Sequence, residues 1–247
     1  MALKQENHAL TAAQFTEHLK SISSPEVAQK HLRYFKTGPG EYAEGDIFMG
    51  VTMGQIFALA KAYGGMPAME LEKLMESPIH ELRTGAMSIM NQEVRRKQTS
   101  PERRKELYEL YLRRHDRINN WDLVDLAAAH VVGGYLFDKP RQKLYALAKS
   151  DNLWERRTAI VSTWYFIKAG DLKDTFQLAE ILRHDDHDLI HKATGWMLRS
   201  AGDKQPEQLL AFLDQYAATL PRTLLRYAIE KLDKAQRMHY MGLKRAG

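Results

Sequence analysis

The amino-acid sequence predicts an all-α fold and, within that class, a HEAT-like repeat α-solenoid with a concave basic groove. From about residue 10 onward, apolar residues recur at intervals of three and four, and no run of alternating β-branched residues interrupts this pattern. Helix pairs also recur along the chain at a nearly constant spacing, which a globular helical bundle would not show. We therefore expect a single domain of stacked helix pairs over residues 1–247.

The expected helices are separated by Gly, Pro, Asn and Asp residues, which are the usual residues of helix caps and turns. Between these breaks, the apolar spacing predicts helices over residues 11–22, 25–36, 54–65, 69–77, 80–95, 101–114, 121–132, 141–150, 154–170, 175–184, 189–202, 206–217 and 221–232.

Two segments lie outside this pattern. Residues 36–51, with the sequence KTGPGEYAEGDIFMGV, are too irregular for a helix and long for a simple connection. They are either a mobile insertion without function or a loop that reaches a ligand, and we expect the first. Residues 236–247 follow the last repeat and are expected to form a flexible tail.

The repeat is clearest in the second helix of each pair, where an alignment of the segments places five residues in one column. The spacings between successive members are 38, 36, 35 and 34 residues. Because the second helices of a solenoid line one side of the stack, this column predicts a stripe along the concave surface. The stripe consists of four cations and one tryptophan, namely Arg83, Trp121, Arg157, Lys192 and Arg226.

Composition limits the possible functions. The chain has 36 Lys and Arg against 31 Asp and Glu, so a net charge of +5 is compatible with a polyanionic partner. It has no cysteine, which excludes disulfides, thiolate nucleophiles and Cys-ligated zinc and fits a reducing, cytoplasmic location. No secretory signal, membrane-spanning apolar run, nucleotide-binding loop or common hydrolase motif occurs in the sequence. We expect no cofactor and no membrane association.

One helix carries an unusual pair of residues. In NNWDLVDLAAAHVVGG, residues 119–134, Trp121 and Asp125 stand four apart and therefore share a helix face. The column one turn further along the repeats also contains a second tryptophan, Trp196. An acid within a phosphate-binding surface repels the ligand, so Asp125 either forms an ion pair with a nearby arginine or has a chemical role.

Three motifs in this order favour the chemical role. They are WDLVD at 121–125, DNLWERR at 151–157 and KATGWMLR at 192–199, and RYFK at 33–36 precedes them. With these residues the sequence resembles the AlkD-like DNA alkylation repair glycosylases, which are built from HEAT-like helix pairs. The resemblance spans roughly residues 25–235.

The resemblance implies a DNA repair glycosylase that removes cationic N3- and N7-alkylated purines, such as 3-methyladenine and 7-methylguanine, from duplex DNA without drawing the base into a pocket. It implies that Asp125 is the catalytic carboxylate and that Trp121 and Trp196 pack against the sugar and backbone of the lesion nucleotide. The residues that it implies for DNA binding are Tyr34, Arg157, Lys192, Arg199 and Arg226. A monomer without a metal is expected.

Elementary chemistry agrees with this expectation. An alkylated purine is already a cationic leaving group, so its glycosidic bond breaks without a general acid. An ionised carboxylate can stabilise the oxocarbenium ion at C1′ and accept a proton from the attacking water. The faces of the tryptophan rings would add attraction for the positively charged sugar.

Other interpretations stay open. The chain could be a DNA-shape-binding protein with little excision activity, or a HEAT-type scaffold that binds an acidic peptide. Trp154 and Trp164 are expected to be core residues, and Trp121 and Trp196 could also be core residues.

Two further segments bear on the site. The run HDDHDLIH contains His184, His187 and His191 and superficially resembles a metal site. We expect it instead to be a turn in which Asp185 or Asp186 caps the next helix. Asn120 precedes Trp121 where some relatives have an aromatic residue, which would weaken aromatic contact with DNA and narrow the range of lesions.

Overall fold

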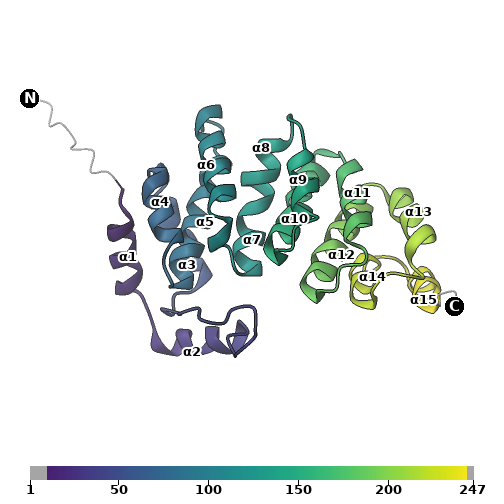
Figure 1. The fold of residues 1–247 in the computed structure, drawn as a ribbon, viewed down its shortest axis with the longest axis horizontal. Helices are drawn as coiled ribbons and strands as arrows, with labels where there is room; N and C mark the ends of the chain where they lie inside the picture. The colour runs from purple at the N-terminus through teal and green to yellow at the C-terminus, as the bar shows by residue number, and fades with distance from the viewer. Residues whose placement is uncertain (1–9, 244–247) are drawn as a thin grey trace, which may run out of the picture. The chain divides into compact units, whose positions relative to one another are not determined.

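The structure is a computed structural model that describes residues 10–243, and these residues form helices joined by turns and, between α2 and α3, by one long irregular segment (Figure 1). Within the described residues there is no β-strand, only an isolated bridge between Ile47 and Ile79. The predicted all-α class is therefore confirmed. The chain divides into two compact units, the first ending at Ala127 and the second beginning at Ala128.

Unit 1 is organised around one buried helix, α5. Of the fifteen residues of α5, only Gln92 is not buried, because α3, α4, α6 and α7 all contact this helix. Gly85 allows a close approach, since a Cβ atom there would lie 2.4 Å from Cε1 of Phe15. The elements of this unit are α1 (Ala12–Ser21), α2 (Pro25–Tyr34), α3 (Met53–Ala62), α4 (Ala68–Met75), α5 (His80–Val94), α6 (Pro101–Arg113), the 3-10 helix η1 (His115–Arg117) and α7 (Trp121–Ala127).

Unit 2 begins with a π-helical stretch, and its later helices alternate as the repeat predicts. The elements are η2 (Ala128–Gly133), α8 (Gly134–Leu136), α9 (Gln142–Leu147), α10 (Leu153–Ala169), α11 (Lys173–Leu182), α12 (Asp188–Gly202), α13 (Pro206–Tyr216), α14 (Arg222–Ala228) and α15 (Lys234–Gly242). Helix α10 contacts η2 and α12, and α12 contacts α14, so the second helices of successive pairs pack in series (Figure 1).

Glycine sets the distance between two of these second helices. A Cβ atom on Gly195 of α12 would lie 2.4 Å from Cβ of Tyr227 and 2.6 Å from the carbonyl oxygen of Leu224 on α14. These distances are too short for any side chain, so glycine at this position permits the close packing of α12 against α14.

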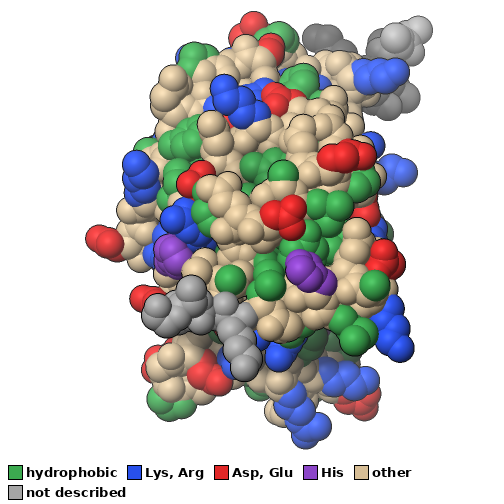
Figure 2. All heavy atoms as spheres, turned by 90° about the vertical axis from the view of Figure 1, so that its right-hand side faces the viewer, with side chains coloured by type: hydrophobic (Ala, Val, Ile, Leu, Met, Phe, Trp, Pro, Cys, Tyr) green, Lys and Arg blue, Asp and Glu red, His purple; other side chains and the backbone are tan. Residues whose placement is uncertain are grey.

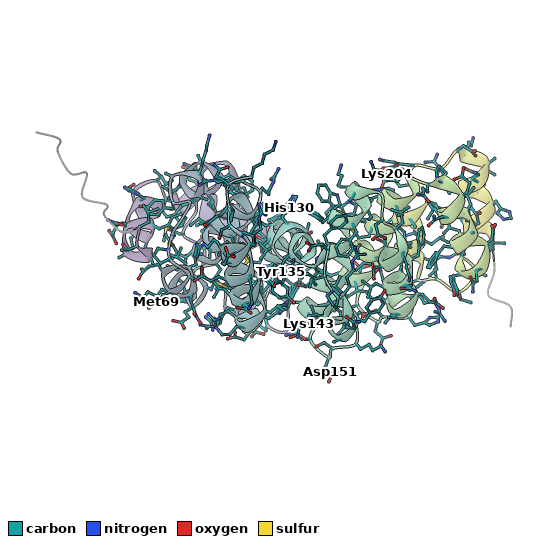
Figure 3. The ribbon with its side chains drawn as sticks, turned by 90° about the horizontal axis from the view of Figure 1, so that it is seen from above. Met69, His130, Tyr135, Lys143, Asp151 and Lys204 are labelled. Atoms are coloured by element: carbon teal, nitrogen blue, oxygen red, sulfur yellow. The ribbon has the colours of Figure 1, made fainter. Side chains whose placement is uncertain are left out.

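The turns of unit 2 lie on two opposite edges. Asp151, in the turn between α9 and α10, lies on one edge, and Lys204, in the turn between α12 and α13, lies on the other (Figure 3). Turns within helix pairs and turns between helix pairs therefore alternate from edge to edge, as expected for stacked antiparallel helices. At the C-terminal end, hydrophobic side chains reach the surface between charged ones (Figure 2).

Residues 36–51, which the sequence suggests are a mobile insertion, make defined contacts with the rest of unit 1 in this structure. The backbone amides of Met49, Gly50 and Val51 donate hydrogen bonds to the carboxylate of Glu81, which is 1% exposed. Ala43 and Phe48 of the same segment are buried. The segment is irregular in conformation, but a buried acid and an apolar cluster fix its path.

Much of the segment 236–247, which the sequence suggests is a flexible tail, lies in α15, which extends to Gly242. Asp233 caps this helix by accepting a hydrogen bond from Gln236 N. Tyr240 is 4% exposed and its hydroxyl donates to Asp214 over 2.7 Å, so the helix packs on α13. Residues 244–247 lie outside the described residues.

Candidate active site and nucleic-acid interface

Helix α7 presents Trp121 and Asp125 on its solvent-facing side. Both residues are partly exposed, whereas Asp122, Leu123 and Val124 between them are buried. Since residues four apart lie one above the other on a helix, the indole ring and the carboxylate share one face. This arrangement excludes a fully buried core role for either residue.

Contacts from residues 34–42 hold the Trp121 ring. Its Nε1 donates a hydrogen bond to the hydroxyl of Tyr42 over 3.2 Å. The ring of Phe35 lies 5.8 Å away between centroids at an interplanar angle of 30°, and the ring of Tyr34 meets it edge-on at 5.9 Å. Tyr34 is itself 65% exposed, so one side of this aromatic group is open to solvent.

A buried ionic network lies directly behind the first turn of α7. His80 Nε2 is 2.7 Å from Asp122 Oδ2, and His80 Nδ1 is 3.3 Å from Asp46 Oδ2. Asp46 Oδ1 accepts further bonds from Arg83 Nη2 at 2.6 Å and from Asn119 Nδ2 at 2.9 Å. Two carboxylates and two cations are thus matched in the interior.

The network sets the protonation of its members. Burial on its own lowers the pKa of His80, but the charge and hydrogen bond of Asp122, with the bond to Asp46, raise it to about 9. At neutral pH the imidazole is therefore charged and both ring nitrogens donate. Burial acts to raise the pKa of Asp46, and the hydrogen bond from His80 and the charge of Arg83 outweigh it, so that this pKa lies below 3.8.

The helix changes its geometry three residues after Asp125. The stretch Ala128–Gly133 is π-helical, with one residue more per hydrogen-bonded ring than an α-helix. Such stretches are rare and frequently occur at functional sites. The apolar spacing of this segment did not predict it, because alanine-rich sequence fits both kinds of helix.

Most of the predicted cation stripe is paired within the protein, which corrects the expectation of an open row of charges. Arg83 and Arg157 are only 3% and 5% exposed. Arg157 Nη1 donates to the carbonyl oxygen of Leu189 over 2.6 Å. Lys192 forms an ion pair with Asp188 at 2.6 Å one turn away.

The remaining predicted cations lie nearer the surface of unit 2. Arg226 on α14 is exposed. Arg199 on α12 is partly exposed and forms an ion pair with Glu230. Arg157 is thus buried and bonded to the Leu189 carbonyl, while Arg226 has the accessibility that a phosphate contact needs.

The tryptophans of unit 2 differ in their surroundings. Trp154 is 9% exposed, which confirms its core role. Trp164 is partly exposed and lies between His130, 5.6 Å away edge-on, and Lys168, whose Nζ lies 4.8 Å from the ring centroid. The prediction of a core role for Trp164 is therefore wrong. Trp196, the predicted partner of the lesion backbone, is partly exposed on α12.

The histidine-rich run forms a helix start. His187, and not Asp185 or Asp186, occupies the cap position of α12, with Nδ1 accepting from Leu189 N over 3.1 Å. Asp185 instead binds Arg156 at 2.6 Å. Within residues 10–243 no cluster of three or more His, Asp or Glu side chains is arranged to hold a metal ion.

Asn120, which stands where some relatives have an aromatic residue, is 0% exposed and lies in the interior. Its Oδ1 accepts a hydrogen bond from Trp121 N over 2.8 Å at the start of α7. The sequence did not indicate the roles of His80 and Asp46, which lie 42 and 76 residues before Asp122. Within the matched motif WDLVD, the only available signal was Asp122 itself.

The packing of the second helices and the aromatic–acid face of α7 define a helical-repeat protein of the HEAT-like class. Within the described residues, no helix is both long and apolar enough to cross a membrane. The chain belongs to the DNA alkylation repair enzyme family, because the model of that family matches residues 15–232. DNA repair of alkylation damage is therefore its general role.

One solved structure supports the fold, and a second is a weaker match. A "Predicted DNA alkylation repair enzyme from Enterococcus faecalis" is 20% identical, with a TM-score of 0.66 over 86% of this chain and 97% of that chain. AlkD2 from Streptococcus mutans is 18% identical, with a TM-score of 0.49 over 90% of this chain and 100% of that chain. A comparison with curated proteins gives no match.

Proposed function

We propose that this DNA alkylation repair protein is a monofunctional glycosylase that hydrolyses the N-glycosidic bond of cationic N3- or N7-alkylated purines in duplex DNA. Asp125 is the proposed catalytic carboxylate. The observation that carries the proposal is the shared, partly exposed face of Trp121 and Asp125 on α7, in a chain of this family. A carboxylate beside an aromatic ring suits a reaction that develops positive charge on a sugar.

The reaction divides into two events at C1′. The bond to the purine breaks and the base leaves with the bonding electrons, which neutralises its positive charge. The sugar becomes an oxocarbenium ion, which the negative charge of Asp125 stabilises. Water then adds to C1′, and the carboxylate accepts its proton. The base is already charged before the bond breaks, so no acid and no base-binding pocket is needed.

DNA binding requires cations at the surface. In unit 2, Arg226 is exposed and Lys192 and Arg199 are partly exposed. In unit 1, Tyr34 is exposed beside Trp121 and is the proposed aromatic contact with the backbone. Contacts of this kind are to phosphate and sugar, so we expect little dependence on base sequence.

The test is release of 7-methylguanine from methylated duplex DNA under single-turnover conditions, compared with the same DNA incubated without protein. We expect protein-dependent release well above the spontaneous rate and no cleavage of the DNA strand. Binding to duplex DNA without excision of 7-methylguanine or 3-methyladenine would favour the non-catalytic DNA-binding function instead. Absence of both binding and excision would favour a protein-interaction scaffold.

A further inference from the structure

Residues 36–51 contact both the Trp121 ring on the surface of unit 1 and the buried His80 imidazole behind it. Tyr42 accepts the hydrogen bond of the Trp121 indole, while Asp46 binds His80 and Arg83. Phe48 packs against the His80 ring at 5.0 Å between centroids. One irregular segment therefore contacts both the partly exposed ring of α7 and the buried imidazole behind it.

This segment is itself held firmly. The carboxylate of Glu81 accepts three consecutive backbone amides of the segment, at 2.9, 2.8 and 3.3 Å for Met49, Gly50 and Val51. Glu81 follows His80 directly in α5. Two adjacent residues of the buried helix α5 therefore hold the segment. Glu81 binds the amides at its end, and His80 binds Asp46 in its middle.

Asp122 fixes the first turn of α7 from the inside. It is 8% exposed and its Oδ2 lies 2.7 Å from His80 Nε2. Successive residues of a helix point in directions about 100° apart, as 3.6 residues per turn require. Holding Asp122 against His80 therefore determines the direction in which Trp121 and Asp125 point away from the interior.

We infer that residues 36–51 and the buried His80–Asp122 pair form a positioning device that sets the orientation of the Trp121 ring. Asp122 and Tyr42 are positioning residues of this device, because they act on Trp121 and touch no reacting atom. The inference rests on the proposed function, in which Trp121 faces the sugar of the lesion nucleotide. It assigns a role to a segment that sequence patterns alone leave as an insertion.

Two variants and a control test the inference. Asp122→Asn removes the charge that holds His80 and keeps the shape of the side chain. Tyr42→Phe removes only the hydroxyl that accepts the Trp121 hydrogen bond, so it gives an answer even if Asp122→Asn fails to fold. Glu93→Gln is the matched control, since Glu93 on α5 is, like Asp122, a buried carboxylate in an ion pair, here with Arg103 at 2.8 Å.

The first readout is independent of activity. Protein labelled with 5-fluorotryptophan has four fluorine resonances, one for each tryptophan, and Trp121→Phe identifies the one from Trp121. We expect Asp122→Asn and Tyr42→Phe to shift or broaden this resonance, whereas Glu93→Gln leaves it in place. A Trp121 resonance unmoved in both positioning variants would overturn the inference.

The second readout compares the effect of each variant on the excision rate with its effect on the affinity for DNA. We expect Asp122→Asn to lower the single-turnover excision rate by about 10-fold or more, because small misplacements of positioning groups have effects of this size. Affinity for undamaged duplex should change less than about 2-fold, since Asp122 is buried away from DNA. An equal loss of rate in Glu93→Gln would attribute the effect to general destabilisation and would overturn the inference.

Different results would overturn the proposed function and the positioning role. Wild-type protein that excises nothing would overturn the proposed function, and the fluorine resonance would still decide whether the device orients Trp121. Normal excision in folded Asp122→Asn and Tyr42→Phe proteins would overturn the positioning role and leave the proposed function intact.

Discussion

His80 and Asp122 form a hydrogen-bonded ion pair inside unit 1, with 2.7 Å between Nε2 and Oδ2 and side-chain exposures of 4% and 8%. Asp46 and Arg83 complete the charge balance around the imidazole. A buried ion pair is stable only while both partners and their hydrogen bonds are present. The protonation of His80 is therefore coupled to the stability of the unit that carries Trp121 and Asp125.

Stability should consequently fall in alkaline solution. Because the pKa of His80 is raised from 6.5 to about 9 on folding, its contribution is complete below pH 6.5 and is lost as the pH rises through about 9. The contribution is on the order of 3 kcal/mol, at about 1.4 kcal/mol per pKa unit. Urea unfolding between pH 6 and pH 10 measures it. The control is Asp122→Asn, whose free energy of unfolding should vary less over this range, and parallel curves for the two proteins would contradict the coupling.

In acid the opposite dependence is expected. The pKa of Asp46 lies below 3.8 in the folded protein, so its contribution is present above that value and is lost as the pH falls further. Asp46→Asn should make the acid limb of the stability curve shallower than that of wild type, because it removes one carboxylate with a lowered pKa. Thermal melting at a series of pH values below 4 measures this difference. A wild-type limb that the substitution does not change would place the acid sensitivity at other carboxylates.

Asp125→Asn separates catalysis from folding. If the carboxylate stabilises the oxocarbenium ion, the amide should lower the excision rate by roughly 10²-fold or more, equivalent to about 3 kcal/mol of lost electrostatic stabilisation. Affinity for DNA should stay level or rise, since a repulsion between acid and phosphate is removed. Single-turnover excision, DNA binding and thermal melting on the same preparation measure all three quantities. Near wild-type excision by folded protein would leave Asp125 with the ion-pair role.

Trp121→Ala and Trp196→Ala should lower the rate less than Asp125→Asn does, on the order of 10-fold each, because a ring attracts the developing cation more weakly than a full negative charge. Both variants should also lose preference for lesion-containing over undamaged duplex. Trp154→Phe is the control, since Trp154 is buried and should affect melting alone. Unaltered lesion preference in both alanine variants would remove the tryptophans from the site.

Arg226 and Arg157 should behave differently, although both belong to the predicted stripe. Arg226 is exposed, so Arg226→Ala should reduce the slope of log affinity against log salt by about 0.9, one phosphate contact. Arg157 is buried and bonded to the Leu189 carbonyl, so Arg157→Ala should cost about 1–3 kcal/mol of stability. The salt slope of Arg157→Ala should match wild type once the protein is folded. A changed slope would return Arg157 to the interface.

Sequence patterns were sufficient for most of the helices and for their repeat. A period of three to four apolar residues and a spacing of 34–38 residues between equivalent positions follow directly from how stacked helix pairs bury one face. The same reasoning identified the common face of Trp121 and Asp125, because positions four apart on a helix always meet. Local geometry determines these features.

Such patterns do not predict how deeply a side chain is buried or which distant residue it contacts. Periodicity assigned Arg83 and Arg157 to a surface stripe, yet Asp46 and the Leu189 carbonyl hold them in the interior. Asp46 is 37 residues from Arg83 and Leu189 is 32 from Arg157, and no pattern of local spacing links residues so far apart. The π-helical turn after Asp125 packs against α10, and this contact is likewise not visible in local spacing.

The three amide bonds to Glu81 also have a consequence for hydrogen exchange. Loop amides usually exchange rapidly with solvent, because brief local openings expose them. The amides of Met49, Gly50 and Val51 bind a carboxylate on the most buried helix of unit 1, so they can open only when α5 itself separates from the segment. In deuterated water these three amides should therefore exchange more slowly than those of a solvent-exposed loop, although the segment is not helical.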